Sequence, residues 1–276
     1  MFLSIDIGGT KTLLALFSPH GLCLKRLKFP TEKDPRIFEQ TLSKNLQIFL
    51  PKPFCRRHVK AITVAIPGVV KIEPDSCSFK FGNLDWPKID LITPIKNLFD
   101  CKIFFANDAN LATLYESTRL GLKSSKSIYL TFSTGIGGGI AKNGELLQNS
   151  DAFEPGHVKY DYKGQKLEWE DLASAKALID TYHCDSLQHL VLDDVTLEDL
   201  LARLSLGLID IINQESPETL IIGGPLAFLF QKIKKPLLEK LRSDTADKLL
   251  RLKRARRPTD STIYGAYLYS KQNYQK

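Results

Sequence analysis

FLSIDIGGTKTLLALF, residues 2–17, runs from one apolar stretch through two adjacent glycines into a second apolar stretch. Two residues without side chains let the backbone fold closely around an anion, and Thr10 with the exposed amides can donate hydrogen bonds to phosphate oxygens. Asp6 ends the first stretch, where a carboxylate can hold hydrated magnesium. The alternative interpretation is a plain hairpin turn, because paired glycines often join two strands. The pattern predicts a phosphate-binding turn formed by Asp6, Gly8, Gly9, Thr10 and Lys11.

Two further glycine clusters follow patterns of buried strands. Residues 133–139, STGIGGG, come after the apolar run 127–132, and Gly223-Gly224-Pro225 ends the apolar run 220–222. The first cluster does not match G-x-G-x-x-G, and the chain contains no P-loop pattern. A buried strand that stops at a glycine turn is typical of a ligand-binding edge. The residues expected to contact a nucleotide here are Thr134, Gly135, Gly223 and Gly224.

Five motifs in the same order resemble the ROK family of bacterial sugar kinases and sugar-responsive repressors. They are Asp6 to Lys11, Asn107-Asp108, Thr134 to Gly139, Glu154-Pro155-Gly156-His157 and Gly223-Gly224. The resemblance extends from Ser4 to about Tyr269. It implies an α/β protein with the two-domain actin-like ATPase (ribonuclease H-like) fold, whose interdomain cleft holds sugar and nucleotide. We expect an N-terminal domain of residues 1–118 plus about 260–276, and a C-terminal domain of residues 119–259.

Alternation and flanking turns predict the main elements. Residues 2–16 and 21–29 should form a hairpin, and residues 59–66, 102–106, 127–132 and 139–142 further strands. Helices are expected over residues 36–50, from residue 108 past Tyr115, and over residues 168–182, 197–214 and 261–272. The chain has 276 residues, 43% of them hydrophobic, enough for two modest cores. No transmembrane span or export signal is recognisable, and five scattered cysteines favour reduced thiols, so we expect a cytoplasmic protein.

Asp108 is the expected catalytic base. Phosphoryl transfer to a sugar hydroxyl needs a carboxylate that takes the proton as the oxygen attacks the γ-phosphorus. The alternative interpretation is a helix cap, since Asp and Asn are favoured just before a helix. Asn107 is expected to orient the same sugar, because a neutral amide both donates and accepts hydrogen bonds.

The family resemblance supplies the other sugar-binding residues. It assigns Glu154 and His157 from the E-x-G-H motif, together with Glu170 from a C-L-E-x-Y-A-S-x-x-A-L segment, with Glu168 as the rival position if a residue has been inserted. Pro67-Gly68 and Asn83-Leu84 resemble two segments that line the family's sugar pocket. Gly68 and Asn83 are therefore expected to bind substrate, and their alternative interpretation is as ordinary turn residues.

Many family members carry a structural zinc bound by the histidine of E-x-G-H and three cysteines. Residues 160–170 of this chain contain no cysteine, and thiolates are what such a site is built from. We therefore predict no zinc site. His157 should then be held by Tyr160, Tyr162 or backbone groups in place of a metal.

Charge gives a weaker indication of partners. The formal net charge is +7, with a local basic run at residues 248–257. The interpretations are a solvated helix face, a binding site for a polyanionic donor such as polyphosphate, and a nucleic-acid site, of which the last is disfavoured. Asp6 lies so near Met1 that we expect no DNA-binding domain ahead of the glycine turn. The resemblance favours a homodimer.

These observations predict a cytoplasmic transferase of carbohydrate metabolism. The expected activity is transfer of the γ-phosphoryl group of ATP, with magnesium, to a hexose, and the family makes the 6-hydroxyl of glucose the first candidate. Alternatives within the family are a polyphosphate-dependent glucokinase, an N-acetylhexosamine kinase and a fructokinase. An alternative of another class is a sugar-binding regulatory protein without catalytic activity.

Overall fold

The computed structural model describes residues 1–68, 70–73, 76–79, 84, 86, 89–122, 125–147, 153–245 and 250–274. The chain divides into two compact units. Unit 1 comprises Met1–Tyr115 with Thr262–Lys276, and unit 2 comprises Glu116–Ser261. Among the helices that the structure describes, none combines the length and the apolar character needed to cross a lipid bilayer.

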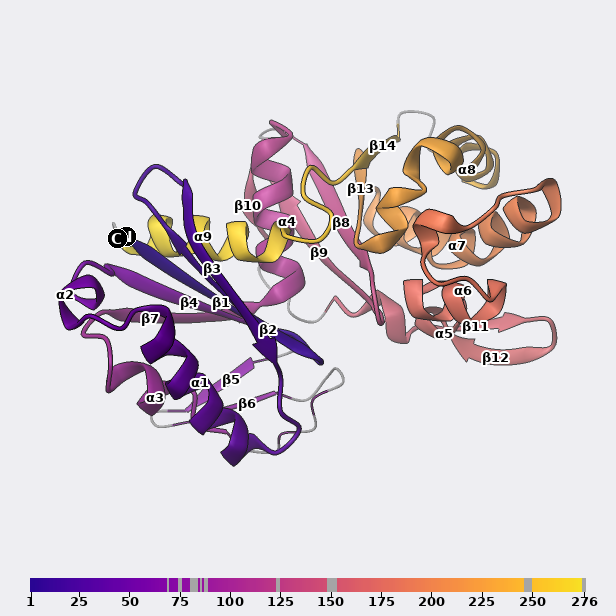
Figure 1. Ribbon diagram of the computed structural model, residues 1–276. Helices are drawn as coiled ribbons and strands as arrows, with labels where there is room; N and C mark the ends of the chain where they lie inside the picture. Colours follow the sequence, from indigo (N-terminus) through magenta and orange to yellow (C-terminus); the bar gives the residue numbers. More distant parts are fainter. Residues whose placement is uncertain are drawn as a thin grey trace. The chain divides into compact units, whose positions relative to one another are not determined.

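Unit 1 is built on a five-stranded sheet of order β3-β2-β1-β4-β7 (Figure 1). Its strands are β1 (Phe2–Ile7), β2 (Lys11–Phe17), β3 (Cys23–Pro30), β4 (Ala61–Ile66) and β7 (Lys102–Asn107). Successive hairpins join β1, β2 and β3 in antiparallel fashion, and β4 and β7 then add in parallel. The segment quoted at the outset is therefore the first hairpin, with its glycines between β1 and β2.

Alternating residues of β1 pack on opposite faces of this sheet. Leu3, Ile5 and Ile7 share a core with α1 (Pro35–Phe49). Phe2 faces the other way and packs against α9 (Ser261–Tyr274). Both faces are thus covered by helices, which explains why β1 and β4 are almost entirely apolar. The smaller elements of unit 1 are α2 (Pro53–Arg56), β5 (Val70–Glu73), β6 (Ser76–Phe79), α3 (Ile92–Lys96) and the first part of α4 (Asp108–Arg119).

Unit 2 repeats the topology of unit 1. Its sheet has the order β10-β9-β8-β13-β14, with strands β8 (Lys126–Phe132), β9 (Ile136–Lys142), β10 (Glu145–Leu146), β13 (Thr219–Gly223) and β14 (Arg251–Arg254). The first three strands are antiparallel neighbours, and the last two add in parallel. The β1–β2 and β8–β9 glycine turns therefore occupy equivalent positions in the two sheets, although the sequence shows no recognisable repeat.

Helices and a small hairpin complete unit 2. They are η2 (Pro155–His157), β11 (Lys159–Tyr162), β12 (Gln165–Glu168), α5 (Trp169–Ala173), α6 (Ala175–Tyr182), η3 (Leu187–His189), α7 (Asp194–Glu215), η4 (Pro225–Phe228) and α8 (Phe230–Asp244). Leu130 and Phe132 pack in one core with Trp169 and Leu208. The helix predicted over residues 168–182 is wrong as a single element. Ser174 breaks it, because its backbone is extended and its hydroxyl accepts from Ala177 N to begin α6.

Candidate active-site residues

The first glycine turn is a tight hairpin whose outer residues are exposed. Gly8 N donates to Lys11 O at 3.1 Å, and Thr10 O accepts from Thr31 N at 3.0 Å. Thr10 and Lys11 are exposed, and Asp6 is partly buried near the end of β1. The turn is thus a hairpin closed by its own backbone, and the Thr10 and Lys11 side chains remain accessible to a ligand. The two interpretations are therefore compatible.

The second glycine turn, between β8 and β9, is shaped by a carboxylate from another part of unit 2. Glu170 Oε2 accepts a hydrogen bond from Ile136 N at 3.3 Å. A Cβ atom at Gly135 would collide with this Glu170 oxygen, and one at Gly156 would collide with Ile136 O. Thr134 is exposed at the tip of the turn. A side chain at position 135 would therefore displace the Glu170 carboxylate from this turn, independently of any phosphate.

His157 lies within hydrogen-bond distance of a glutamate. Of its predicted partners, Tyr160 and Tyr162 are wrong, whereas the backbone groups stay a prediction. His157 Nδ1 lies 3.0 Å from Glu168 Oε2 and 3.9 Å from Glu170 Oε1. Its hydrogen bond with Glu168, assisted by the charges of Glu170 and Glu154, raises the pKa of His157 above its ordinary value. The two tyrosines reach aspartates of α7 instead, because β11 turns its aromatic side chains towards that helix.

The carboxylates and imidazole of this group form a candidate cation site. Ligand atoms of His157, Glu168 and Glu170 all lie within 4.8 Å of one another, and the described part of the chain holds no second such group. The set offers one nitrogen and two carboxylates, whereas a structural zinc site of the thiolate type needs several sulfur ligands. These residues do not fit that type of site, and His157 Nδ1 is already within hydrogen-bond distance of Glu168.

Asn107 and Asp108 lie at the start of α4, and the cap is Asn107. Asn107 Oδ1 accepts from Asn110 N at 2.9 Å, and its Nδ2 donates to Gly68 O at 3.0 Å. Gly68 adopts a φ of 79°, a conformation that favours glycine. The alternative interpretation of Asp108 as the helix cap is therefore wrong, because the preceding side chain fills that position. Asn107 and Gly68 are joined at one point of unit 1, while Asn83 lies outside the described residues.

Asp108 is a carboxylic acid whose environment disfavours its charge. Its Oδ1 accepts from Ala109 N at 2.7 Å, an interaction that by itself favours the ionised form. Burial is the larger effect and raises the pKa of Asp108 from 3.8 to about 6. A carboxylate with a pKa close to neutrality is suited to exchanging a proton with substrate, so the predicted base has the expected physical character.

Gly223 and Gly224 are required by packing at the end of β13. A Cβ atom at Gly223 would collide with the ring of Tyr129, and one at Gly224 with the backbone of Phe132. Gly224 has a φ of 68°, and its N–H donates to Pro258 O at 2.9 Å. The close approach of chain segments explains both glycines without a ligand, so their expected role at a nucleotide stays a prediction.

From Arg251 onward the basic run is a strand and a loop, so its interpretation as a helix face is wrong for that part, while Lys248 lies outside the described residues. Leu252 and Ala255 are buried, and the intervening side chains point outward along the edge strand β14. Arg254 Nε donates to Ala227 O, and Arg256 Nη1 donates to Arg119 O. Two of its guanidinium groups therefore bind carbonyl oxygens within unit 2.

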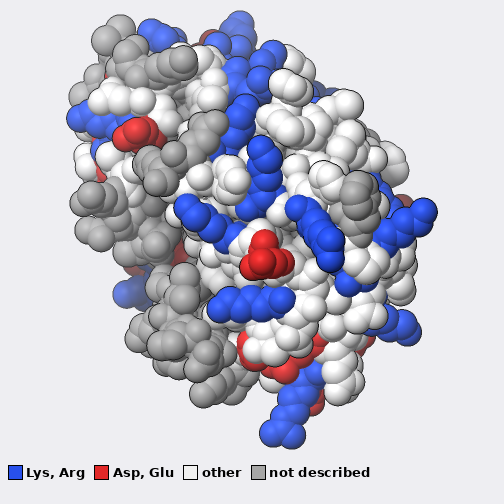
Figure 2. All heavy atoms as spheres, turned by 90° about the vertical axis from the view of Figure 1, so that its left-hand side faces the viewer, with Lys and Arg blue, Asp and Glu red and all other residues white. Residues whose placement is uncertain are grey.

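The net positive charge belongs to unit 1. Unit 1 contains 18 Lys and Arg against 10 Asp and Glu, whereas unit 2 contains 20 against 21. On the face drawn in Figure 2, Lys and Arg side chains are spread widely and Asp and Glu side chains are fewer. The basic run at residues 248–257 lies in unit 2, so it does not account for the net positive charge of the chain.

Comparison with known proteins gives a consistent family. The model of the ROK family matches residues 2–273. A fructokinase from Lactococcus lactis subsp. cremoris is 30% identical over 173 residues, which cover 61% of this chain and 56% of that protein. The chain spans about half the length of the curated relatives it matches.

Solved structures resemble the whole chain. A ROK family transcriptional regulator gives a TM-score of 0.83 at 21% identity and covers 99% of this chain and 78% of its own. A ROK family glucokinase from Streptomyces griseus, solved with glucose and AMPPNP, gives 0.75 at 20% identity and covers 98% and 99%. The predicted α/β fold of the two-domain actin-like ATPase type is confirmed by this similarity.

Two contacts of unit 2 are not predicted by the sequence motifs, that of Glu168 with His157 and that of Asp199 with Tyr162. In the sequence Glu168 stands out only as a rival sugar ligand, and no motif includes Asp199. Its spacing of eleven residues from Asp210 places both on one face of α7, and Tyr160 and Tyr162 share one face of β11. These two periodicities would have suggested a polar seam between helix and hairpin.

Proposed function

Because this chain belongs to the ROK family, we propose that it transfers the γ-phosphoryl group of ATP to a hydroxyl of a hexose, with the 6-hydroxyl of glucose as the first candidate. The observation that carries the proposal is the half-buried Asp108 at the start of α4, whose pKa of about 6 suits a general base. The fructokinase relative and the glucokinase with similar fold support the same reaction class.

Each unit contributes groups of the kind that this reaction needs. In unit 1, Asp108 would take the hydroxyl proton, and Asn107 would orient the sugar with the amide hydrogen that neither Gly68 nor the cap uses. In unit 2, Glu154, His157 and Glu170 would accept or donate hydrogen bonds to sugar hydroxyls. The turns containing Gly8, Gly9, Thr10, Lys11, Thr134 and Gly135 would contact phosphates, and Gly223 and Gly224 would flank adenosine.

Asp6 would hold hydrated Mg²⁺. Its partly buried carboxylate at the end of β1 is an oxygen ligand of the kind that this ion prefers, and the ion would neutralise charge on the transferred phosphate. The exposed Thr10 and Lys11 side chains next to it would then contact the phosphate oxygens. Cytoplasmic residence and a homodimer are part of the same proposal.

A substrate and donor survey tests this function. Purified protein is assayed with Mg·ATP or polyphosphate against glucose, mannose, fructose, N-acetylglucosamine and N-acetylmannosamine, with Asp108→Asn in parallel. We expect turnover with ATP and at least one hexose, reduced roughly 10²–10⁴-fold in the variant while sugar binding persists. Sugar binding without turnover for any pair would contradict a kinase.

A regulatory protein is the competing class, and one observation favours it. A xylose repressor from Bacillus subtilis is 29% identical over 186 residues, close to the 30% of the fructokinase relative. A sugar sensor would bind its ligand equally well before and after Asp108→Asn and would show no turnover in either form. Assays of the parent protein and of Asp108→Asn therefore distinguish a kinase from a sugar sensor.

A further inference from the structure

The hairpin β11–β12 leads directly into the candidate sugar-binding residues. Glu168 is its last residue, and α5 begins at once with Trp169 and Glu170. Trp169 N donates to Val158 O at 2.9 Å, which fixes the far end of the hairpin next to η2 and His157. Any shift of the hairpin would therefore change the spacing of Glu168, His157 and Glu170.

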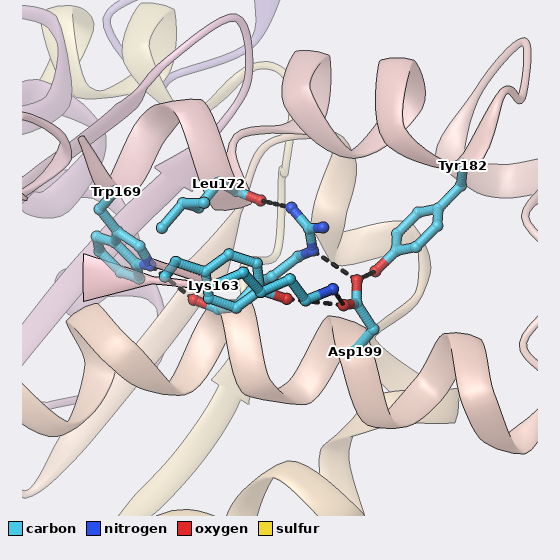
Figure 3. A network of polar contacts seen from close by, with 7 residues as sticks. Lys163, Trp169, Leu172, Tyr182 and Asp199 are labelled. Atoms are coloured by element: carbon cyan, nitrogen blue, oxygen red, sulfur yellow. Dashed lines mark hydrogen bonds and ion pairs between the residues drawn. The ribbon is translucent and has the colours of Figure 1, made fainter. Parts of the chain in front are cut away.

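Asp199 of α7 is the centre of the contacts that hold this hairpin (Figure 3). Its Oδ1 accepts from Tyr162 Oη at 2.7 Å and from Lys163 Nζ at 3.0 Å. Its Oδ2 accepts from Arg203 Nε at 2.5 Å and from Tyr182 Oη at 3.0 Å. One carboxylate thus joins the hairpin, α6 and α7.

Arg203 extends these contacts to both sides of Glu170. Its Nη1 donates to Leu172 O at 3.3 Å, and its backbone carbonyl accepts from Trp169 Nε1 at 3.0 Å. Its guanidinium group also lies 4.9 Å from the centre of the Tyr162 ring. Residues 169 and 172 flank Glu170 in α5, so α7 fixes this short helix as well as the hairpin (Figure 3).

The hydrogen bonds keep Asp199 ionised and its partners protonated. Burial alone would raise the pKa of Asp199, but bonds from Tyr162, Arg203, Lys163 and Tyr182 hold it well below its ordinary value. The same partnership, together with burial, raises the pKa of Tyr182. Near neutral pH, Asp199 is therefore ionised, and the hydroxyl groups of Tyr162 and Tyr182 keep the protons that they donate to it.

A second tether lies on the same face of α7. Tyr160 Oη donates to Asp210 Oδ2 at 3.0 Å, and Gln214 Nε2 donates to Asp210 Oδ1 at 2.7 Å. Tyr160 and Tyr162 are two residues apart, so both point from β11 to the helix. The hairpin is fastened to α7 at two points by tyrosine hydroxyls.

We propose that Asp199 is a positioning residue, which fixes β11–β12 and α5 so that Glu168, His157 and Glu170 keep the arrangement needed to bind sugar. Side-chain hydrogen bonds would then hold this segment in place, as a bound metal ion does in a site built from thiolates. The consequence for substrate rests on the proposed kinase function, whereas the consequence for His157 does not.

The test compares Asp199→Asn with Asp193→Ala in the full chain. Asp193 caps the same helix by accepting from Thr196 N at 2.7 Å, and it is a partner in none of the hydrogen bonds given above for the hairpin. Its loss should destabilise α7 by about 1 kcal/mol without moving the hairpin. The pair therefore separates general destabilisation of the helix from positioning.

The primary readout is the imidazole pKa of His157, measured by NMR titration and assigned with His157→Gln. We expect Asp199→Asn to lower this pKa towards its ordinary value, because Glu168 no longer stays within hydrogen-bond distance, and Asp193→Ala to leave it unchanged. The sugar KM should rise at least tenfold in Asp199→Asn, with the nucleotide KM within twofold of the parent. A folded Asp199→Asn with unchanged His157 pKa and sugar KM would overturn the proposal.

A milder variant covers the case in which Asp199→Asn does not fold. Tyr162→Phe removes one hydroxyl and leaves Asp199 its other three partners, so the same pKa shift should appear at reduced size. An unchanged pKa in folded Tyr162→Phe would count against the proposal. A parent protein without turnover would overturn the kinase function alone, because the His157 titration still decides whether Asp199 positions that histidine.

Discussion

Asp108 combines a raised pKa with a position at the start of α4, and this determines how activity should depend on pH. The general base must be ionised, so kcat/KM should rise as pH passes through about 6, where burial has placed the pKa of Asp108. A pH–rate profile measures this directly. The exposed Asp100, replaced by Asn, provides a matched control in unit 1 and should leave the profile unchanged. An acidic limb centred near pH 4 would contradict the assignment.

The same burial makes Asp108 costly for stability at neutral pH. Because the folded-state pKa lies above 3.8, the native state binds the proton more tightly than the unfolded chain, and stability falls as pH rises from 3.8 to about 6. Asp108→Asn should therefore stabilise the protein at about pH 8 by up to roughly 3 kcal/mol and have little effect at about pH 4. Urea unfolding at both pH values measures the difference, and a variant less stable at pH 8 would refute it.

Gly135 is constrained by a neighbour that is distant in sequence. Gly135→Ala should destabilise unit 2 by about 1 kcal/mol, the low end of the range for overpacking, since the added methyl collides with the Glu170 carboxylate and this group ends a flexible side chain that can move. Truncation to Glu170→Ala removes the obstacle, so adding Gly135→Ala to that background should destabilise much less. Thermal unfolding of the four proteins of this double-mutant cycle tests the contact. Equal effects of Gly135→Ala in both backgrounds would show that the collision is not the cause.

Elements are joined in unit 2 by a buried carboxylate of α4. Glu116 is fully buried and accepts from Arg256 N at 2.7 Å, Arg257 N at 2.9 Å and Ser261 Oγ at 2.6 Å. These donors belong to the segment that leads from β14 into α9. The start of α9 is thus fixed to α4 by a contact between residues about 140 apart in the chain.

Glu116→Ala should destabilise the protein by roughly 1–3 kcal/mol, because it leaves one buried donor, the Ser261 hydroxyl, and two partly buried backbone N–H groups without their acceptor. Glu239→Ala is the matched control, since Glu239 is an exposed helical glutamate whose carboxylate lies 4.0 Å from Lys235 Nζ. Its effect should stay below about 0.5 kcal/mol. The denaturant midpoints of the two variants measure these effects, and we expect the midpoint of Glu116→Ala to be the lower one. Similar midpoints would rule out a structural role for Glu116.

At the scale of the whole molecule, the two units differ in charge and share a topology. Unit 1 carries all of the net positive charge, and unit 2 carries the hairpin β11–β12, which contains no cysteine. The equivalent sheet orders explain why glycine turns occur at corresponding first hairpins in both units. Similar topology without recognisable sequence repeat means that the backbone pattern, and not the side chains, is what the two units have in common.

The chain should fold without a structural metal. We expect purified protein to contain far less than one equivalent of zinc, and its melting temperature to be unchanged by a chelator, because hydrogen bonds to Asp199 and Asp210 already hold the hairpin. Elemental analysis and thermal melts with and without EDTA measure this. One equivalent of zinc, with a melting temperature lowered on its removal, would instead place a cation at His157, Glu168 and Glu170.

Local patterns in the sequence were enough to predict most elements of the fold. The helix expected over residues 36–50 is α1, the strand over 102–106 is β7, and the helix over 197–214 is α7. Such predictions succeed because hydrophobic periodicity, glycine turns and capping residues act over a few neighbouring positions. Ser174 shows the limit, since one hydroxyl cap divided a continuous helical pattern into α5 and α6.

The sequence by itself determined where glycine turns follow strands, which residue is the candidate base (Asp108) and to which family the motifs belong. Only the tertiary structure decided that Glu170 reaches the glycine turn at Gly135 and Ile136, and that Asp199 holds the hairpin β11–β12. The physical reason is distance along the chain. A cap or a turn depends on adjacent residues, whereas the contacts of Glu170 and Asp199 join segments more than thirty residues apart and exist only once the core has placed them side by side.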